Sequence, residues 1–344
     1  MKALTFNRYT LSCALAAMLT GCSGSQARIG SPGAVSQSYT PASSLDPQAS
    51  SQGLLYLSDN GTGDVYAYSY PQSRLVSTLK IPSGNALGEC VDSAGDVFVT
   101  AMESSGGSMI YEYVHGGTNP IETLSDPGQA YGCAIDSKSG NLAVTNGRDE
   151  HNPYYQNAGD LAVYAGAQGQ PKMYYVQNNK IQGFRFCGYD NDDNLYLAAV
   201  DNYHSNNDLL RLSNGSSSFE TINLPKKLYG WSPVQWDGKH MTVSSDPSVH
   251  SRRGGPISIY RLRISASSAT IIGTTELNSE KNHYGGQLWI QGNTVTGVGA
   301  YKRGYENAFL WPYPNGGKPR RTIKKVGYRG VELFGVTVSV AGSR

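Results

Sequence analysis

The side chains best suited to bind a ligand or partner gather in a few polar segments of this 344-residue chain. The longest segments are GRDEHNPYYQNAG (147–159), DNYHSN (201–206) and DPSVHSRRGGP (246–256). They combine imidazole, guanidinium, phenol and carboxylate groups, which together can hold a polar ligand, and long loops often carry function. The candidate binding residues are Arg148, Asp149, His151, Tyr154, Tyr155, Tyr203, His204, Asp246, His250, Arg252, His283, Tyr284, Tyr301, Arg303, Tyr328 and Arg329.

Metal chemistry is not favoured by the spacing of these residues. No HxH, HxxxH or Cys–His pair is present at the spacing of metal ligands. Asp190, Asp192 and Asn194 imitate the start of a calcium loop, but Leu195 occupies the position where such a loop needs glycine. We interpret that segment as a polar turn between two strands, and we expect no metal and no cofactor.

The composition favours an all-β protein that does not bind nucleic acid. Gly occurs 41 times and Tyr 24 times, and only 16% of the residues are charged. The formal charge is +2, and removal of Lys2 and Arg8 with a signal segment leaves 26 basic (28 − 2) and 26 acidic residues. A general nucleic-acid-binding protein would be clearly basic.

The first 22 residues have the parts of a secretion signal. Lys2 and Arg8 precede a short apolar run, residues 11–19, and the segment ends in Leu-Thr-Gly-Cys at Cys22. This resembles the bacterial lipoprotein signal, and the resemblance implies cleavage before Cys22 and lipid on that residue. We therefore expect a signal peptide at 1–21 and an extracytoplasmic protein anchored in a membrane, the outer membrane if the cell is Gram-negative. Residues 22–52, rich in Ser, Pro, Gly and Gln, are predicted to be a flexible tether.

One pattern repeats from residue 53 onward: an apolar strand, a polar turn containing Gly or Asp, and a second apolar strand. The copies are GECVDSAGDVFVT (88–100), GCAIDSKSGNLAVT (132–145), FCGYDNDDNLYLA (186–198), PVQWDGKHMTVS (233–244) and QLWIQGNTVTGV (287–298). Matched apolar positions lie 43 to 54 residues apart, and two further strands fit between copies. This period is typical of a four-stranded propeller blade.

The two ends of the repeat region complement each other. The region opens with LLYLSD, a second strand without its first, and closes with LFGVTVSV (333–340), a first strand without its second. Joining them completes one blade and predicts six blades in a closed ring over 53–340, followed by a tail at 341–344. The pattern resembles six-bladed propellers of the NHL and YVTN-repeat kind, with SMP-30/gluconolactonase-like propellers as neighbours.

The resemblance sorts the loops and leaves two functions open. It implies that the long polar segments share one face, so we predict a monomeric binding module for an envelope protein or polysaccharide. The alternative is a metal-dependent enzyme of the lactonase or lyase type. SMP-30-like lactonases hold a divalent ion in the central channel, and the residues here that could face a channel are Glu89, Gln235, Gln287 and Glu332.

Two further features are interpreted as structural. Cys90, Cys133 and Cys187 fall in first strands of successive blades, and we expect free thiols, because equivalent positions on neighbouring blades should be too far apart to bond. The basic segment KPRRTIKK (318–325) is predicted to be the outermost strand of a blade, where lysine and arginine discourage the addition of another strand. Contact with an anionic lipid or polysaccharide is the alternative for this segment.

Overall fold

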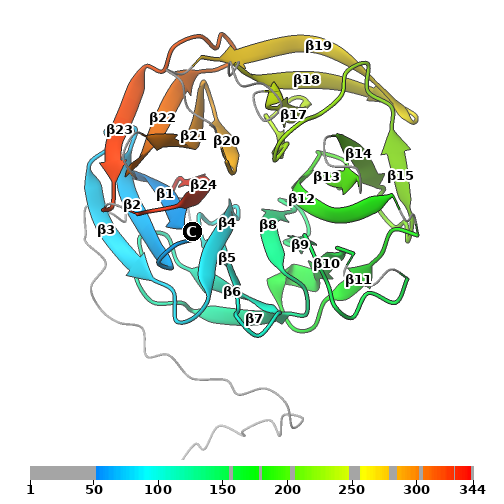
Figure 1. Cartoon of the computed structure of the whole chain (residues 1–344), viewed down its shortest axis with the longest axis horizontal. Coiled ribbons are helices and arrows are strands. Elements are labelled where there is room, and N and C mark those ends of the chain that lie inside the picture. The colour runs from blue at the N-terminus through cyan, green and yellow to red at the C-terminus, as the bar shows by residue number, and fades with distance from the viewer. Residues whose placement is uncertain are drawn as a thin grey trace, which may run out of the picture. The chain divides into compact units, whose positions relative to one another are not determined.

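Six four-stranded antiparallel sheets surround a central axis (Figure 1). The computed structural model describes residues 52–154, 158–177, 180–201, 206–247, 256–278, 285–301, 305–328 and 330–341. The only helix among these residues is a short 3-10 turn, η1 (Ala165–Ala167), and no helix in this part of the chain is long and apolar enough to cross a membrane. The predicted all-β six-bladed propeller is therefore confirmed.

Each blade is a chain-ordered meander, except that the first blade takes its innermost strand from the end of the repeat region. Blade 1 contains β24 (Leu333–Ser339), β1 (Gly53–Asp59), β2 (Asp64–Tyr70) and β3 (Leu75–Lys80). Blade 2 contains β4 (Asn85–Val91), β5 (Val97–Met102), β6 (Ser108–Tyr113) and β7 (Glu122–Asp126), and blade 3 contains β8 (Ala130–Ile135), β9 (Leu142–Asn146), β10 (Leu161–Tyr164) and β11 (Lys172–Tyr174). Blade 4 contains β12 (Ile181–Tyr189), β13 (Leu195–Asp201), β14 (Asn207–Leu212) and β15 (Phe219–Ile222). Blade 5 contains β16 (Val234–Trp236), β17 (Met241–Ser245), β18 (Ile257–Ser265) and β19 (Ser268–Leu277), and blade 6 contains β20 (Leu288–Gln291), β21 (Thr294–Tyr301), β22 (Tyr305–Pro312) and β23 (Arg321–Val326).

Strand β24 closes the ring as the sequence predicts. It pairs antiparallel with β1, with Tyr56 opposite Thr337 and Leu55 opposite Val338. This pairing gives blade 1 its full four strands. Strand β23, which contains most of the basic segment, is the outermost strand of blade 6, and its Arg321, Lys324 and Lys325 are exposed.

The aspartate that ends the first strand of several blades closes the following turn. The Oδ1 atom of Asp92 accepts hydrogen bonds from the backbone N–H groups of Ala94 and Asp96 at 2.9 and 2.8 Å. Asp136, Asp190 and Asp237 accept backbone N–H groups in the same way. Such side-chain turns explain why the repeat carries Asp at this position, because a short carboxylate replaces missing backbone partners.

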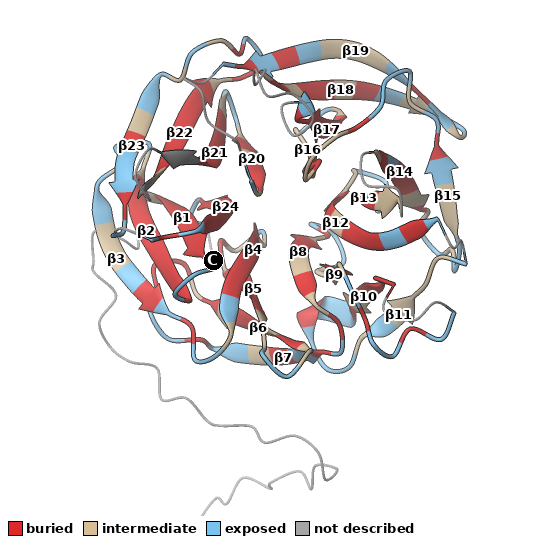
Figure 2. Cartoon of the chain, in the orientation of Figure 1, coloured by how far each residue is buried: buried red, intermediate tan, exposed pale blue. Residues whose placement is uncertain are grey.

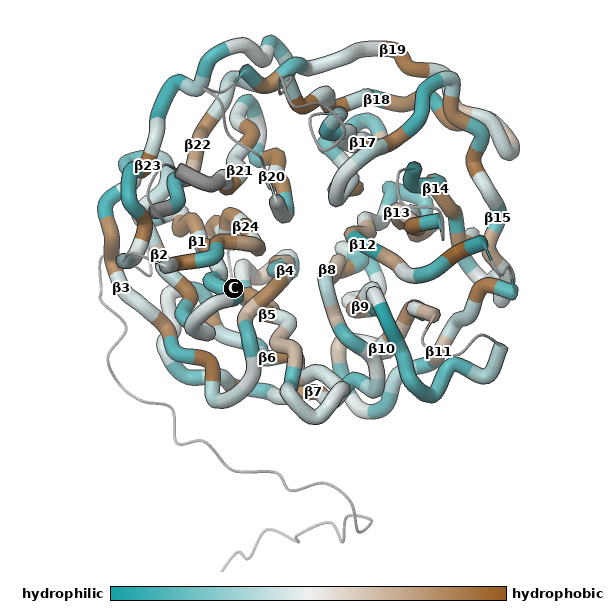
Figure 3. Tube along the Cα trace, in the orientation of Figure 1, coloured by the Kyte–Doolittle hydropathy of each residue, from teal (hydrophilic) through white to brown (hydrophobic). Residues whose placement is uncertain are grey.

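The core lies between adjacent blades and toward the axis. Strands such as β1, β2 and β5 are buried at almost every position, because both faces of a blade pack against its neighbours. Figure 3 shows hydrophobic residues along the strands of the ring. Figure 2 shows burial along the inner strands and exposure on outermost strands such as β3, β15 and β23. Large side chains such as Tyr56 and Trp311 are completely buried between blades. Burial of one large apolar side chain stabilises the fold by about 1.5–3 kcal/mol.

Glycines bring the innermost strands into direct backbone contact around the axis. A Cβ atom at Gly335 in β24 would lie 2.1 Å from the Leu87 carbonyl oxygen of β4, and one at Gly188 in β12 would lie 2.9 Å from that of Val234 in β16. Between blades 5 and 6 a glutamine makes the contact. The Nε2 atom of Gln235 donates to the Ile290 carbonyl oxygen at 2.9 Å, and its Oε1 accepts the Ile290 N–H at 2.7 Å.

A further close approach of this kind, between β4 and β8, overturns the expectation for the cysteines. Cys90 and Cys133 form a disulfide between blades 2 and 3, with their Cα atoms 5.6 Å apart, whereas Cys187 is a buried free thiol. The prediction of three free thiols was wrong because a Cβ at Gly88 would lie 2.6 Å from the Cα of Gly132. Gly132 directly precedes Cys133, and Gly88 lies two positions before Cys90. The two strands can therefore approach far more closely than side-chain packing would allow.

Candidate functional site on the long-loop face

The antiparallel order of every blade defines two faces of the ring. The segments that follow second strands and those that lead into first strands emerge on one face, because these strand ends point the same way. We call it the long-loop face, since it includes the 147–159, 201–206 and 246–256 segments. The opposite, short-turn face carries the hairpin turns that join first to second strands.

The segment 147–159 is anchored on blade 4 by glycines at both of its ends. A Cβ at Gly183 in β12 would lie 2.2 Å from the Gly147 carbonyl oxygen, and a Cβ at Gly159 would lie 2.7 Å from the Cα of Gly183. The Gly159 N–H also donates to the Gln182 carbonyl oxygen at 2.8 Å. Blades 3 and 4 therefore meet through backbone at this point, with no side chains between them.

A cavity of about 390 Å³ opens above this contact between blades 3 and 4. Its walls come from the starts of β8 and β12, the segment that follows β9 and the end of β13. A Cβ at Gly147 would lie 1.7 Å from the Tyr131 ring, so the glycine keeps space beneath that ring. The described lining residues are Gln129, Tyr131, Gly147, Arg148, Gln182, Gly183, Arg185 and Val200, and none of them is acidic.

Arg185 lines the cavity with its guanidinium group packed against aromatic rings. Its guanidinium carbon lies 4.2 Å from the centroid of the Trp231 ring and 5.4 Å from that of Tyr131. Trp231 in turn packs edge-on against Phe334, with ring centroids 4.8 Å apart. Stacking of this kind holds a guanidinium group in place through cation–π attraction.

Arg185 has weak electrostatic compensation for its burial. Its Nε atom is buried without a hydrogen-bond partner, and among the described residues no carboxylate forms an ion pair with it. Burial lowers the pKa of the guanidinium below its ordinary value, although a hydrogen bond to the Tyr131 side chain opposes this shift. A buried cation with only a neutral partner is costly, so the site would gain from an added anion.

A group of buried acids lies under the 147–159 segment rather than on its surface. Asn146 donates from Nδ2 to Oδ1 of Asp126 and of Asp160, each at 2.7 Å, and burial raises the pKa of Asp126 to about 6. Burial and the adjacent Asp149 carboxyl raise the pKa of Asp160.

The described candidate residues lie in different surroundings. Arg148 lines the cavity and pairs loosely with Glu150, at 3.9 Å between exposed groups. Asp149 and Asp246 are buried, at 1% and 5% exposure, so their carboxylates do not lie on the outer surface. His151, Tyr154 and Tyr328 are exposed. Residues that lie outside the described part are Cys22, Tyr155, Tyr203, His204, His250, Arg252, His283, Tyr284, Arg303 and Arg329, together with the side chain of Tyr301.

The channel candidates do not converge. Gln235 and Gln287 line a second cavity of about 220 Å³ on the axis, together with the Cys90–Cys133 disulfide. Both amides are occupied: Gln235 by the backbone of Ile290, and Gln287 by the backbone of Glu89, to whose carbonyl oxygen its Nε2 donates at 2.6 Å.

The two glutamates lie elsewhere. The Glu89 carboxyl is completely buried, lacks a hydrogen-bond partner, and has a pKa raised well above its usual range by burial, while Glu332 is exposed. Within the described ranges, no three His, Cys, Asp or Glu side chains are grouped so that they could hold a metal ion.

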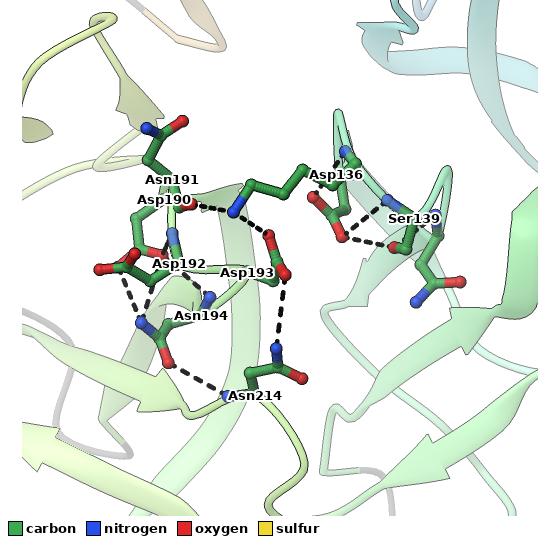
Figure 4. Close-up of polar contacts among 10 residues, drawn as sticks. Asp136, Ser139, Asp190, Asn191, Asp192, Asp193, Asn194 and Asn214 are labelled. Atoms are coloured by element: carbon green, nitrogen blue, oxygen red, sulfur yellow. Dashed lines mark hydrogen bonds and ion pairs between the residues drawn. The ribbon is translucent and has the colours of Figure 1, made fainter.

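The calcium-loop imitation is a polar turn on the short-turn face. Figure 4 shows the carboxylate of Asp190 accepting hydrogen bonds from Asn194, whose N–H lies 2.9 Å from Oδ1. Across the gap between blades, Lys138 donates to the Asn191 carbonyl oxygen and pairs with Asp193 at 3.1 Å. The segment therefore latches blade 3 to blade 4, which confirms the interpretation as a turn.

Sequence reasoning missed Arg185, Tyr131 and Trp231. Arg185 stands between two phenylalanines in β12, IQGFRFCGY, and a charged residue in an innermost strand was a signal for a site. Its aromatic partners could not be found in the same way, because they come from other blades.

Solved structures with the same architecture are distant in sequence. No protein-family model and no curated protein matches the chain. TolB from Acinetobacter baumannii superposes with a TM-score of 0.53 at 12% identity, over 83% of this chain and 67% of that one. The PQQ-bound form of aldose sugar dehydrogenase from Streptomyces coelicolor gives 0.53 at 12% identity over 75% and 90%, and the propeller domain of Myceliophteria thermophila Cps50 (Swd1) gives 0.50 at 10% over 79% and 86%. At such identities the likeness shows the fold alone: this chain is similar to known β-propellers.

Proposed function

We propose that the chain is a lipid-anchored, extracytoplasmic binding module that holds a ligand or partner on its long-loop face. The observation that carries the proposal is the polar cavity of about 390 Å³ between blades 3 and 4. Such a concave site with several convergent polar groups on a rigid scaffold is the usual form of a binding site. Arg148, selected from the sequence, and the overlooked Arg185 both line it.

Two observations support the location. Leu-Thr-Gly-Cys at the end of an apolar segment, residues 19–22, matches the lipoprotein signal. The Cys90–Cys133 disulfide is independent of that signal and is typical of oxidising compartments outside the cytoplasm. An anchor at Cys22 and a tether to residue 52 would let the propeller bind envelope polysaccharide or an envelope protein.

The enzyme alternative gains no support from the described residues. Gln235 and Gln287 use their amides to join blades, and Glu89 is completely buried against Gly335 of β24 and does not line the axial cavity. We therefore retain binding as the proposed function.

Co-sedimentation of the detergent-solubilised full chain with insoluble cell-wall polysaccharide tests the proposal. The double variant Arg148→Ala/Gln182→Ala removes two exposed polar groups of the cavity, and Lys239→Ala removes one charge from the short-turn face. We expect the double variant to lose most of the sedimented fraction and the control to keep it. Equal retention of all three proteins would contradict the proposed site, and no retention of the wild type would exclude cell-wall polysaccharide as the partner.

A further inference from the structure

We propose that the cavity between blades 3 and 4 binds an oxyanion, a carboxylate or phosphate on a small polar ligand, with Arg185 as the central contact. This inference rests on the proposed function for its location and adds the chemical class of the ligand. The group that singles out this class is a guanidinium with a buried Nε that lacks a partner and with no carboxylate paired to it in the described chain.

The charged side chains that line the cavity favour an anion. Two arginines, Arg148 and Arg185, line it, and the described lining residues include no acid. Asp149 and Asp160 are buried and do not line the cavity, whereas the exposed Glu150, also outside the lining, pairs with Arg148 at 3.9 Å. A negative ligand group would therefore meet Arg185, which has no carboxylate partner among the described residues, beside Arg148, which pairs with Glu150.

The other lining groups suit the body of a polar ligand. Gln129 and Gln182 place amides at the rim, and each can donate to or accept from a hydroxyl group. Gly147 and Gly183 close the base, where the Tyr131 ring packs against Gly147 and the Gly147 carbonyl oxygen packs against Gly183. An oxyanion bound by Arg185 and a hydroxylated body bound by the glutamines would use every polar wall.

Arg185 is prepared for this role before a ligand arrives. The Trp231 and Tyr131 rings fix the plane of its guanidinium. Two parallel N–H groups of a fixed guanidinium match the two oxygens of a carboxylate or phosphate. Ordering of the side chain has thus been completed on folding and adds little cost on binding.

Isothermal titration of the full chain in detergent at low ionic strength tests the inference with three probes. D-Glucuronate carries a carboxylate, D-glucose is its neutral counterpart, and inorganic phosphate is the second oxyanion. We expect heat of binding from glucuronate, phosphate or both, weakened by added salt, and none from glucose. Which of the two anions binds distinguishes the carboxylate from the phosphate.

Three variants connect the binding to Arg185. Arg185→Lys keeps the charge but loses the planar fork, and we expect roughly 10-fold weaker binding; Arg185→Gln should weaken it roughly 100-fold. Arg263→Gln removes an exposed arginine beside the β18–β19 turn on the short-turn face and should bind like the wild type. If Arg185→Gln fails to fold, the Lys variant and the glucose comparison still decide.

Glucose bound as tightly as glucuronate, silence with all three probes, or unchanged anion binding by either Arg185 variant would overturn the inference. The two proposals fail separately. Retention on polysaccharide that depends on Arg148 and Gln182, without anion binding, would support the binding module and exclude an oxyanion as its ligand. Anion binding without retention would support a small-ligand site on the long-loop face and exclude cell-wall polysaccharide as what it binds.

Discussion

Removal of the Cys90–Cys133 bridge should destabilise the propeller by an amount that follows from the length of chain it closes. The bridge joins residues 43 apart in sequence. In the chain-entropy description, closing a loop of that length lowers the entropy of the unfolded chain by about 13 cal/mol/K, which corresponds to about 4 kcal/mol at 25 °C. We therefore expect the free energy of unfolding to fall by about that amount in Cys90→Ala/Cys133→Ala.

The same figure can be expressed as a change in melting temperature. Unfolding entropy is about 2.1 cal/mol/K per residue near the transition, and the ring contains roughly 290 residues. A loss of about 4 kcal/mol then lowers Tm by about 7 °C. Cys187→Ala is the matched control, because it removes a buried sulfur from the neighbouring first strand without breaking a bridge. Subtracting twice the loss of unfolding free energy measured for this control corrects the double variant for the packing of its two sulfur atoms.

Two assays make the comparison. Urea unfolding can be followed by the fluorescence of the four tryptophans, all of which lie in the ring. Alkylation in denaturant without reductant should label Cys187 and leave Cys90 and Cys133 unlabelled. Labelling of all three would refute the bridge itself. A corrected loss below about 1 kcal/mol would refute the argument from loop length, with the bridge still present.

Three more predictions concern buried groups and close contacts. Burial raises the folded-state pKa of Glu89 above the unfolded value of about 4.3, so wild-type stability falls as the pH rises from that value toward the folded pKa. In urea unfolding across this range, the free energy of unfolding of Glu89→Gln should increase relative to the wild type by about 1.4 kcal/mol per pH unit. A difference that does not change with pH would contradict this. Gly147→Ala places a Cβ 1.7 Å from the Tyr131 ring, so we expect the free energy of unfolding to fall by about 1–3 kcal/mol and anion binding to weaken. The control Gly285→Ala, whose added Cβ has its nearest neighbour 3.8 Å away, should destabilise the protein less. The opposite order would exclude the packing argument. Gln235→Leu leaves the Ile290 N–H and carbonyl without partners and should cost about 2 kcal/mol in thermal unfolding, while the exposed Gln168→Leu should cost almost nothing; equal melting temperatures would show that these hydrogen bonds contribute little.

The fold was predictable because each blade repeats a local pattern. Strand alternation and the turn-closing Asp depend on residues close in sequence, so both can be found without knowing which blades touch. Ring closure was also predictable, since LLYLSD lacked a first strand and LFGVTVSV lacked a second, and β24 pairs with β1 as that argument requires.

The disulfide and the cavity depend on contacts between blades, which the repeat does not encode. Cys90 and Cys133 meet because Gly88 and Gly132 admit backbone contact, a property of the pair rather than of either strand. Arg185 likewise acquires its character from Tyr131 in blade 3 and Trp231 before blade 5. Composition alone cannot show that an arginine lacks a carboxylate partner, because that depends on every neighbour brought near by folding.

The glycines at the axis have a geometric consequence for how this protein can vary. In a closed ring the angles between neighbouring blades must add up to one full turn. A methyl group added at Gly335 or Gly188 would widen one angle, and the other five would have to narrow to keep β24 paired with β1. A substitution at one such glycine therefore requires all six blades to adjust their packing, whereas a substitution in an outer strand affects only its own blade.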